Sequence, residues 1–578
     1  MTNDLKKFYD QLTSEEVILA SDVAVDNLGV VMRAGINELD LAYDIINQIN
    51  PITEADYERM YIMRIGVIRL IKLAMQAHPH FDAPSVTFQR SLKLSGSVLS
   101  LIAQIGTIEH GRRVAQSLIS KNGQIRKIDE IFYISLPEDL PDHEWHEREL
   151  DKYMNKYYSN ILTQGFESLI TSDMSKEVKL LLNKLVYPFR THFIGYEAHF
   201  ALDSYFYGHA YNEIILSKGF DTFHFATYFG KQTFQNYKLA ATFIVSIGLK
   251  HRAFVRALIE KVPTIRIEDI LTVSVITADF LEGLREFINV FGAQQEGHVP
   301  VNDEDVKNIF DVLSISRKNL ALLDRPGAPI PPLVQCSDEH VIRPLIGATS
   351  DGVMLFLLNS LQFNFPKEYD KAQRDREGVM QRVIEATLRP LLPEIDYRFN
   401  IKLKRNKNTL TDIDMILFER STKHMVLIQL KHQDPYGEDI ATKQARTGRL
   451  NQQIHEWLGK VRSWIASSSV NEIQATFRLP PLQKNPQISL LVVTRHYAHS
   501  LRHVVDGEDV SSANWTQFVT AVERLMEKDI KQIILDDLIF ELKFLSIPNE
   551  EYYLPEPRSE WRVGNLHYTI EQKGRPSK

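Results

Sequence analysis

The chain of 578 residues contains a single cysteine, Cys336. One cysteine cannot form a disulfide within the chain, and it excludes zinc and iron–sulfur sites that are built from several thiolates. We expect Cys336 to be a small buried apolar residue rather than a nucleophile. The sequence also lacks the G-x-x-x-x-G-K-[ST] run that binds nucleotide phosphates and the G-x-S-x-G run that carries a serine nucleophile. It therefore contains no nucleotide-cofactor motif.

Long hydrophobic runs are also missing, since every apolar stretch is shorter than the roughly 20 residues that a membrane-spanning helix needs. The first residues show no apolar stretch of the kind found in a signal peptide. We therefore expect a cytoplasmic protein without a membrane partner. Hydrophobic residues make up 44% of the chain and charged residues 24%, which is enough apolar material for a buried core and excludes the disordered and collagen-like classes.

Up to about residue 320 the apolar residues recur three and four positions apart, as in helices, with few strand-like runs such as 131–135. We predict one or more mainly α-helical domains over 1–320. Four prolines fall within residues 324–332, and they predict a linker that continues into a connecting helix over 321–370. We expect an α/β domain over 371–550 and a C-terminal tail over 551–578, so the chain is predicted to be multidomain.

The periodicity changes within residues 371–550. A helical pattern over 375–392 precedes three strand-like runs at 397–404, 411–419 and 424–431, and a long helical pattern follows at 440–466. A further strand is predicted at 488–495, a helix at 515–526 and a last strand at 533–545. This order of helices and strands predicts a compact mixed α/β domain.

Polar residues interrupt the second and third of these strands near the end where both would meet. Asp412 and Asp414 are two residues apart, as are Gln429 and Lys431, and side chains two apart share one face of a strand. A hairpin would bring a carboxylate, an amide oxygen and an ammonium group together. Metal-assisted phosphodiester hydrolysis needs such a set, because Mg²⁺ prefers oxygen ligands and a lysine can stabilise the negative charge of the transition state.

This pattern resembles the PD-(D/E)xK, or restriction-endonuclease-like, nucleases. In that family a helix with an acidic residue precedes a hairpin that carries Asp on one strand and (E/Q)xK on the next. Asp414 matches the hairpin aspartate, and Gln429, Leu430 and Lys431 match the QxK variant of Mrr-like members. The resemblance covers roughly residues 370–500 and nothing before residue 340.

The resemblance implies that the C-terminal α/β domain has the restriction-endonuclease-like fold and is a Mg²⁺-dependent endonuclease, with Mn²⁺ as an alternative ion. Glu377, Asp414, Gln429 and the Leu430 carbonyl would hold the metal, and Lys431 would position the attacking water or stabilise the phosphate. By analogy, the resemblance also implies DNA rather than RNA as the substrate, and a role in bacterial defence or DNA processing.

Several assignments have an alternative at this point. Glu377, in an Arg-Glu-Gly entrance that matches family members, is the favoured helix acid, and Glu385 two turns later is the alternative. Asp414 is favoured over Asp412 as the hairpin ligand because an apolar strand follows it directly. Gln429 is neutral where most members carry glutamate. The alternative function is therefore a catalytically degenerate protein that binds nucleic acid or acts as a scaffold.

The net charge of the whole chain is only −7, but it is unevenly spread. Residues 371–470 contain 18 Lys and Arg against 12 Asp and Glu, a net charge of +6, so the other 478 residues carry −13. Basic side chains near such a site favour nucleic acid as the partner, because contacts with phosphates supply affinity that does not depend on base sequence. The candidate nucleic-acid-binding residues are Lys402, Lys404, Arg405, Lys407, Lys443, Arg446 and Arg449.

Residues 187–237 contain 16 aromatic residues. Aromatic residues at helical spacing most often form a core or an interface, and we expect the same here. Stacking on nucleobases or on a flat ligand is the alternative. The helical half could recognise the target, hold a nuclease inactive or form a homo-oligomer. As a ligand sensor it would make the protein a ligand-gated nuclease.

Overall fold

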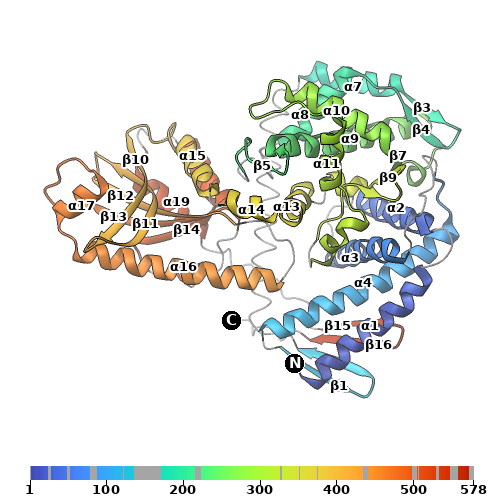
Figure 1. Ribbon diagram of the computed structural model, residues 1–578, viewed down its shortest axis with the longest axis horizontal. Helices are drawn as coiled ribbons and strands as arrows, with labels where there is room; N and C mark the ends of the chain where they lie inside the picture. Colours follow the sequence, from blue (N-terminus) through green and yellow to red (C-terminus); the bar gives the residue numbers. More distant parts are fainter. Residues whose placement is uncertain are drawn as a thin grey trace.

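The computed structural model describes residues 2–23, 28–48, 53–77, 88–121, 123–135, 171–214, 223–325, 328–349, 352–373, 375–433, 440–496, 501, 504–505, 507–528, 533–546 and 558–571. Figure 1 shows a body built mostly of helices beside a lobe built on a five-stranded sheet. We call the described parts of residues 2–373 and 558–571 the helical body, and those of 375–546 the sheet module. A helical N-terminal region and a mixed α/β C-terminal region are both as predicted.

Long helices with apolar stripes form most of the helical body. α3 and α4 pack so closely that a methyl group added at Gly66 would lie 2.3 Å from the Ile102 carbonyl oxygen, so only glycine fits there. α9 is buried along most of its length. The principal helices are α1 (Asn3–Val23), α2 (Leu28–Ile46), α3 (Glu54–Ala77), α4 (Leu92–Lys121), α7 (Ser172–Leu185), α8 (Phe200–Asn212), α9 (Phe234–Lys261), α10 (Thr277–Gly292) and α11 (Asp303–Leu313).

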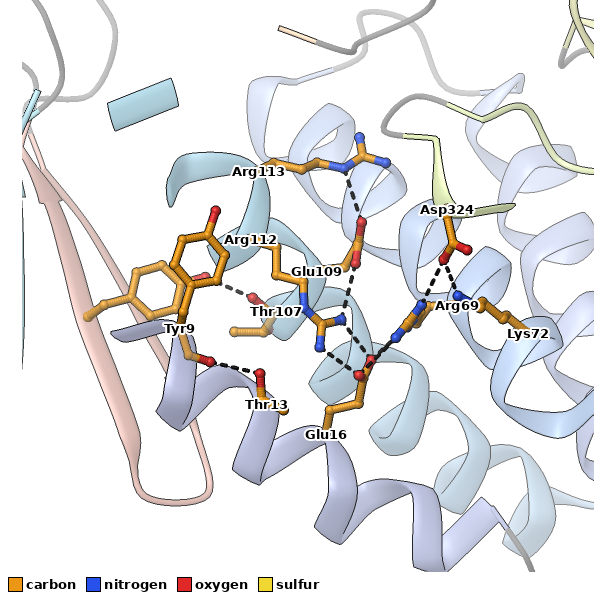
Figure 2. A network of polar contacts seen from close by, with 11 residues as sticks. Tyr9, Thr13, Glu16, Arg69, Lys72, Thr107, Glu109, Arg112, Arg113 and Asp324 are labelled. Carbon is orange, nitrogen blue, oxygen red and sulfur yellow. Dashed lines mark hydrogen bonds and ion pairs between the residues drawn. The ribbon is translucent and has the colours of Figure 1, made fainter. Parts of the chain in front are cut away.

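A polar network ties α1 to α3 and α4 (Figure 2). The Glu16 carboxylate accepts two hydrogen bonds from Arg69, at 2.6 and 2.8 Å, and two from Arg112, at 2.7 and 2.5 Å. Burial by itself would raise the pKa of Glu16, but the hydrogen bonds from Arg112 and Arg69 outweigh it and lower that pKa to about 2. Asp324 extends the network by pairing with Arg69 and Lys72. The network therefore braces the N-terminal helices.

Residues 321–370 pack into the helical body instead of forming the predicted linker. β8 and β9 form a sheet with β7, and Leu333, Val341 and Leu357 are buried in one core cluster. Cys336 is buried, as expected. Prolines mark breaks in regular structure, but the apolar residues between them are still buried in the core of the helical body. The elements are η3 (Arg317–Asp324), β7 (Val273–Ile276), β8 (Val334–Gln335), β9 (His340–Arg343), α12 (Leu345–Thr349), α13 (Val353–Asn364) and α14 (Pro366–Gln373).

Residues 558–571, predicted to lie in a tail, form a hairpin of β15 (Arg558–Val563) and β16 (Leu566–Glu571) that belongs to the helical body. β16 pairs in parallel with β2 (Ile131–Ser135), which pairs with β1 (Gln124–Ile128). Tyr568 is buried, and its hydroxyl donates to the Thr107 carbonyl at 2.9 Å. The sheet module is therefore inserted between two segments of the helical body.

The aromatic residues of 187–237 pack mainly on one another and on neighbouring helices, as expected. Phe223, Phe229, Phe234 and Tyr237 are buried in a core cluster. Tyr207 of α8 stacks on Phe291 of α10 with ring centres 4.2 Å apart. Short strands connect these helices: β3 (Val186–Phe189), β4 (Phe193–Tyr196), β5 (Tyr228–Phe229) and β6 (Gln232–Thr233), with η2 (Ile267–Asp269) after α9. Across the described parts of the chain, no helix has both the length and the apolar character required to cross a membrane.

The sheet of the sheet module has the order β10-β11-β12-β13-β14. β10, β11 and β12 form an antiparallel meander, whereas β13 and β14 join in parallel. The central strand β12 is an almost continuous apolar run, as expected for a strand that is covered on both faces. The strands are β10 (Ile395–Arg405), β11 (Asn408–Glu419), β12 (His424–Lys431), β13 (Gln487–Thr494) and β14 (Val510–Asn514).

Helices cover both faces of this sheet, with separate apolar clusters beneath them. One face packs against α15 (Arg376–Leu388), α18 (Trp515–Glu527) and α19 (Leu535–Ser546), and the other against α16 (Ile440–Ser467) and α17 (Val470–Phe477). The strand predicted over 533–545 is wrong, because this segment is helix α19. Its buried residues follow helical rather than strand spacing, namely Leu535, Leu538, Ile539 and Leu542.

Candidate active site

The predicted site residues come from three elements, and the structure brings them together. Glu377 is in the first turn of α15, Asp414 is in β11, and Gln429 and Lys431 are at the end of β12. The Lys431 Nζ lies 3.4 Å from Glu377 Oε1, and Gln429 Nε2 lies 2.5 Å from Asp414 Oδ2. A carboxylate from a helix and one from a strand therefore meet the amide and ammonium groups of the neighbouring strand.

Asp414 lies just beyond the point where the β11–β12 pairing stops. The paired positions end at Met415 and Ile428. Beyond them the Leu430 N–H donates to Asp414 Oδ2 at 2.7 Å, and the Gln429 amide donates to the same oxygen. The carboxyl group thus takes the place of a backbone acceptor. These two hydrogen bonds hold the buried Asp414 side chain where the two strands diverge.

This environment raises the pKa of Asp414 to about 7. Burial is the largest cause, because it penalises the charged carboxylate, and the negative charge of Glu377 adds to the effect. The Leu430 N–H and the positive charge of Lys431 act in the opposite direction, while Asp412 contributes a smaller increase. A buried carboxyl with such a pKa gains most from a bound cation, which would favour its ionised form.

Lys431 and Glu377 form an ion pair that remains partly open to solvent, since their side chains are 22% and 39% exposed. A pair of this kind contributes only up to about 1 kcal/mol to stability. Its consequence is therefore one of placement, because it holds the ammonium group beside the Glu377 carboxylate. The Lys431 side chain is thus within reach of solvent.

Two polar residues that the sequence did not single out support the site from behind. The buried Gln381, one helical turn after Glu377, donates from Nε2 to the Asp414 carbonyl at 2.8 Å and to Asn400 Oδ1 at 2.9 Å. Asn400 has a left-handed φ of 53°, a conformation that asparagine tolerates better than most residues. The signal in the sequence that could have identified Gln381 is its position as a polar residue within the apolar stripe of α15.

The two alternative acids, Glu385 and Asp412, have other partners than Glu377 and Asp414 do. Glu385 pairs with Arg389, four residues later on α15. Asp412 is exposed, and its carbonyl oxygen accepts a hydrogen bond from Trp457 Nε1 at 3.0 Å. The geometry therefore favours Glu377 over Glu385 and Asp414 over Asp412.

The predicted nucleic-acid-binding residues lie on two elements, the hairpin of β10 and β11 and the helix α16. Lys402 lies opposite Asp412 and Arg405 opposite Asn408, so these residues run from near Asp414 to the hairpin tip. At about 3.4 Å per residue the tip is about 20 Å from Asp414. On α16, Arg449 is exposed, whereas the side chain of Lys443 lies outside the described residues. The hairpin residues, all exposed, are Lys402, Lys404, Arg405 and Lys407; Arg446 on α16 is partly exposed.

The donor atoms at the site suit a hard divalent cation such as Mg²⁺. Asp414 and Glu377 supply carboxylates. The Gln429 Oε1 is buried and has no hydrogen-bond partner among the described residues, so it is available as a neutral ligand beside the Leu430 carbonyl. In the described ranges there is no group of three or more His, Cys, Asp or Glu that could hold a metal. Asp414, Glu377 and Gln429 therefore supply donor atoms of the type that this ion prefers.

Comparisons with known proteins add no assignment to this geometry. No protein-family model, no curated protein and no solved structure matches the chain.

Proposed function

We propose that the protein is a metal-dependent nuclease that hydrolyses phosphodiester bonds, with the active site at Glu377, Asp414, Gln429 and Lys431. The observation that carries this proposal is the convergence of these residues from three elements around a buried carboxylate with a pKa raised to about 7. Strongly perturbed carboxylates beside a lysine are typical of functional sites.

The order of elements supports the same proposal. A helix that carries an acid, α15, precedes the antiparallel strands β10, β11 and β12, and α16 then connects β12 to its parallel neighbour β13. This is the order of the restriction-endonuclease-like core, to which we assign the sheet module. The QxK sequence at the end of β12 is the variant associated with Mrr-like members.

The chemistry follows from the position of each group. A bound Mg²⁺ or Mn²⁺ would neutralise the phosphate, polarise its oxygen and lower the pKa of a water molecule. Glu377, Asp414, Gln429 and the Leu430 carbonyl would hold the ion. Lys431 would orient the attacking water and stabilise the negative charge that develops on the phosphate, since its ammonium group lies 3.4 Å from Glu377 at the open side of the site.

Nucleic acid is the proposed substrate, with DNA favoured over RNA. Exposed basic residues run from near Asp414 along the β10–β11 hairpin, where they would contact phosphates of a bound strand. The affinity should therefore fall steeply with salt. A cytoplasmic location and a role in bacterial defence or DNA processing belong to the same proposal.

Cleavage of supercoiled plasmid and of a labelled RNA, each with Mg²⁺, Mn²⁺ or chelator, tests the proposal directly. The wild type should cut in the presence of metal and not in chelator. Asp414→Ala and Lys431→Ala should lose this activity, whereas Glu385→Gln, on the same helix but paired with Arg389, should keep it. Equal activity in wild type and Asp414→Ala would remove the site assignment.

A second candidate function is nucleic-acid binding without cleavage. The Gln429 amide lies 2.5 Å from Asp414 and satisfies the carboxylate without a metal, which is the observation that favours it. Such a protein would bind DNA equally well in chelator and in Mg²⁺, and wild type and Lys431→Ala would both leave DNA and RNA intact. Gel-shift titrations beside the cleavage assay separate the two functions.

A further inference from the structure

Arg376, the first residue of α15, lies at the junction between the helical body and the sheet module. Its side chain is buried, and the guanidinium carbon lies 4.0 Å from the centre of the Phe223 ring and 5.2 Å from that of Tyr369. Both rings belong to a core cluster of the helical body. The electron-rich faces of the rings attract the guanidinium. The start of a sheet-module helix is therefore held by side chains of the other body.

The same helix turn also meets the strand that carries Lys431, because Lys431 Nζ lies 3.4 Å from Glu377 Oε1. The pKa of His496 is lowered well below its usual range by burial and then by the positive charges of Arg495, His432, Arg376 and Arg446. His496 is the second residue after β13, and the N–H of Arg495 between them donates to the Lys431 carbonyl at 2.9 Å. The core of the helical body thus contacts the first turn of α15 at Arg376, and the end of β12 contacts the same turn at Glu377.

We propose that Arg376 is a positioning residue for Glu377, and that the aromatic core of the helical body sets the geometry of the metal site through it. The inference rests on the proposed function, because it takes Glu377 as a metal ligand. α14 ends at Gln373 and α15 begins at Arg376, so two residues separate a helix of the body from the helix that carries Glu377. The Glu377 side chain is 39% exposed, and its position therefore depends on the backbone of that first turn.

Phe223→Leu tests the inference from the side of the helical body, without changing any residue of the sheet module. The control is Phe229→Leu, which removes a ring from the same core, 5.0 Å from Phe223. Mn²⁺ binding to the full chain, measured by electron paramagnetic resonance, gives a readout that does not require cleavage. Loss of an outer support typically weakens metal binding 10- to 100-fold. We expect about 10-fold weaker binding in Phe223→Leu and Arg376→Met, and wild-type binding in Phe229→Leu.

Hydrogen exchange of the amides in α15 provides a second readout that is independent of any metal. It should become faster in the first turn of α15 in Phe223→Leu and remain unchanged in Phe229→Leu. Wild-type Mn²⁺ binding in Phe223→Leu, or an equal loss in both leucine variants, would overturn the inference. If the wild type binds no more Mn²⁺ than Asp414→Ala, the proposed function fails instead, and unchanged exchange in Phe223→Leu would then overturn the role of Arg376.

Discussion

Replacing Asp414 by asparagine should make the metal-free protein more stable at pH 8. In the wild type the Asp414 carboxyl group is buried, and its pKa is raised to about 7. The folded protein must therefore either keep a proton on this group or bury a negative charge, so folding becomes less favourable as the pH rises. Asparagine carries no charge at any pH. Its amide oxygen can still accept the Leu430 N–H, and the Gln429 amide can turn to present its own oxygen.

The size of the effect follows from the difference between the two pKa values. The unfolded carboxyl titrates near 3.8 and the folded one near 7, about 3 units apart, which corresponds to a ceiling of about 4 kcal/mol. Because the folded state binds the proton more tightly, wild-type stability is lost as the pH rises from 3.8 to 7. Rearrangement around the charge reduces this loss, and we expect a difference of about 2 kcal/mol between Asp414→Asn and wild type at pH 8.

Urea unfolding in chelator measures this difference. Tryptophan fluorescence reports mainly on the sheet module, which contains three of the five tryptophans, Trp457, Trp464 and Trp515. The stability difference should be near zero at pH 4 and grow up to pH 7. Addition of Mg²⁺ at pH 8 should stabilise the wild type and leave Asp414→Asn unchanged. Asp412→Asn, an exposed position on the same strand, is the control and should show no such gain. A less stable Asp414→Asn at pH 8, or a difference that does not vary with pH, would refute the reasoning.

Three further predictions concern other parts of the chain. Gln429→Glu adds a second negative charge beside Asp414, so it should raise the pKa of that carboxyl further and lower the Mg²⁺ concentration needed for half-maximal cleavage, measured by metal titration at pH 8. Deleting residues 551–578 removes the buried Tyr568 and leaves β2 without its parallel partner, so circular dichroism should show an earlier melting transition, whereas deleting only 572–578 should not change it. Glu16→Gln leaves two arginines without their shared carboxylate and should cost about 2 kcal/mol in urea unfolding at pH 7. Because the pKa of Glu16 is lowered to about 2, this difference should shrink as the pH falls from about 4.5 towards 2.

The sheet could be predicted where a strand carries its own hydrophobic signal. β12 is apolar almost throughout, so its bounds were predicted from the sequence, and the same is nearly true of β13. β14, with the sequence Val-Ser-Ser-Ala-Asn, carries no such signal and was missed, although every residue in it is buried. Its burial comes from β13 and the covering helices rather than from its own composition. The sequence of α19 predicts a strand as readily as a helix, because a short dense run of Ile, Leu and Phe fits both periods.

The candidate site could be predicted in part because its residues are close in the sequence. Asp414, Gln429 and Lys431 fall on neighbouring strands of one meander, so the alternation of side chains is enough to bring them together. The contacts that hold them were not predictable in this way. Gln381 reaches the Asp414 carbonyl from α15, and Asn400 has a left-handed backbone in the strand opposite. Such contacts depend on how helix and sheet pack, which no local pattern encodes.

The segments predicted to be a linker and a tail explain how the two bodies are connected. The prolines of 321–370 predict a linker, and the position of 551–578 at the end of the chain predicts a tail. Both segments nevertheless contain buried residues that complete the helical body, such as Tyr369 and Tyr568. The sheet module therefore leaves this body at α14 and returns to it at β15, and two connections restrict its motion more than one would. Arg376 lies beside the first of these connections. A change in the aromatic core of the helical body would thus reach Glu377 through the contact of Phe223 with Arg376 and the backbone that joins Arg376 to Glu377. Substitutions at Phe223 therefore test the link between the bodies more sharply than substitutions within the site.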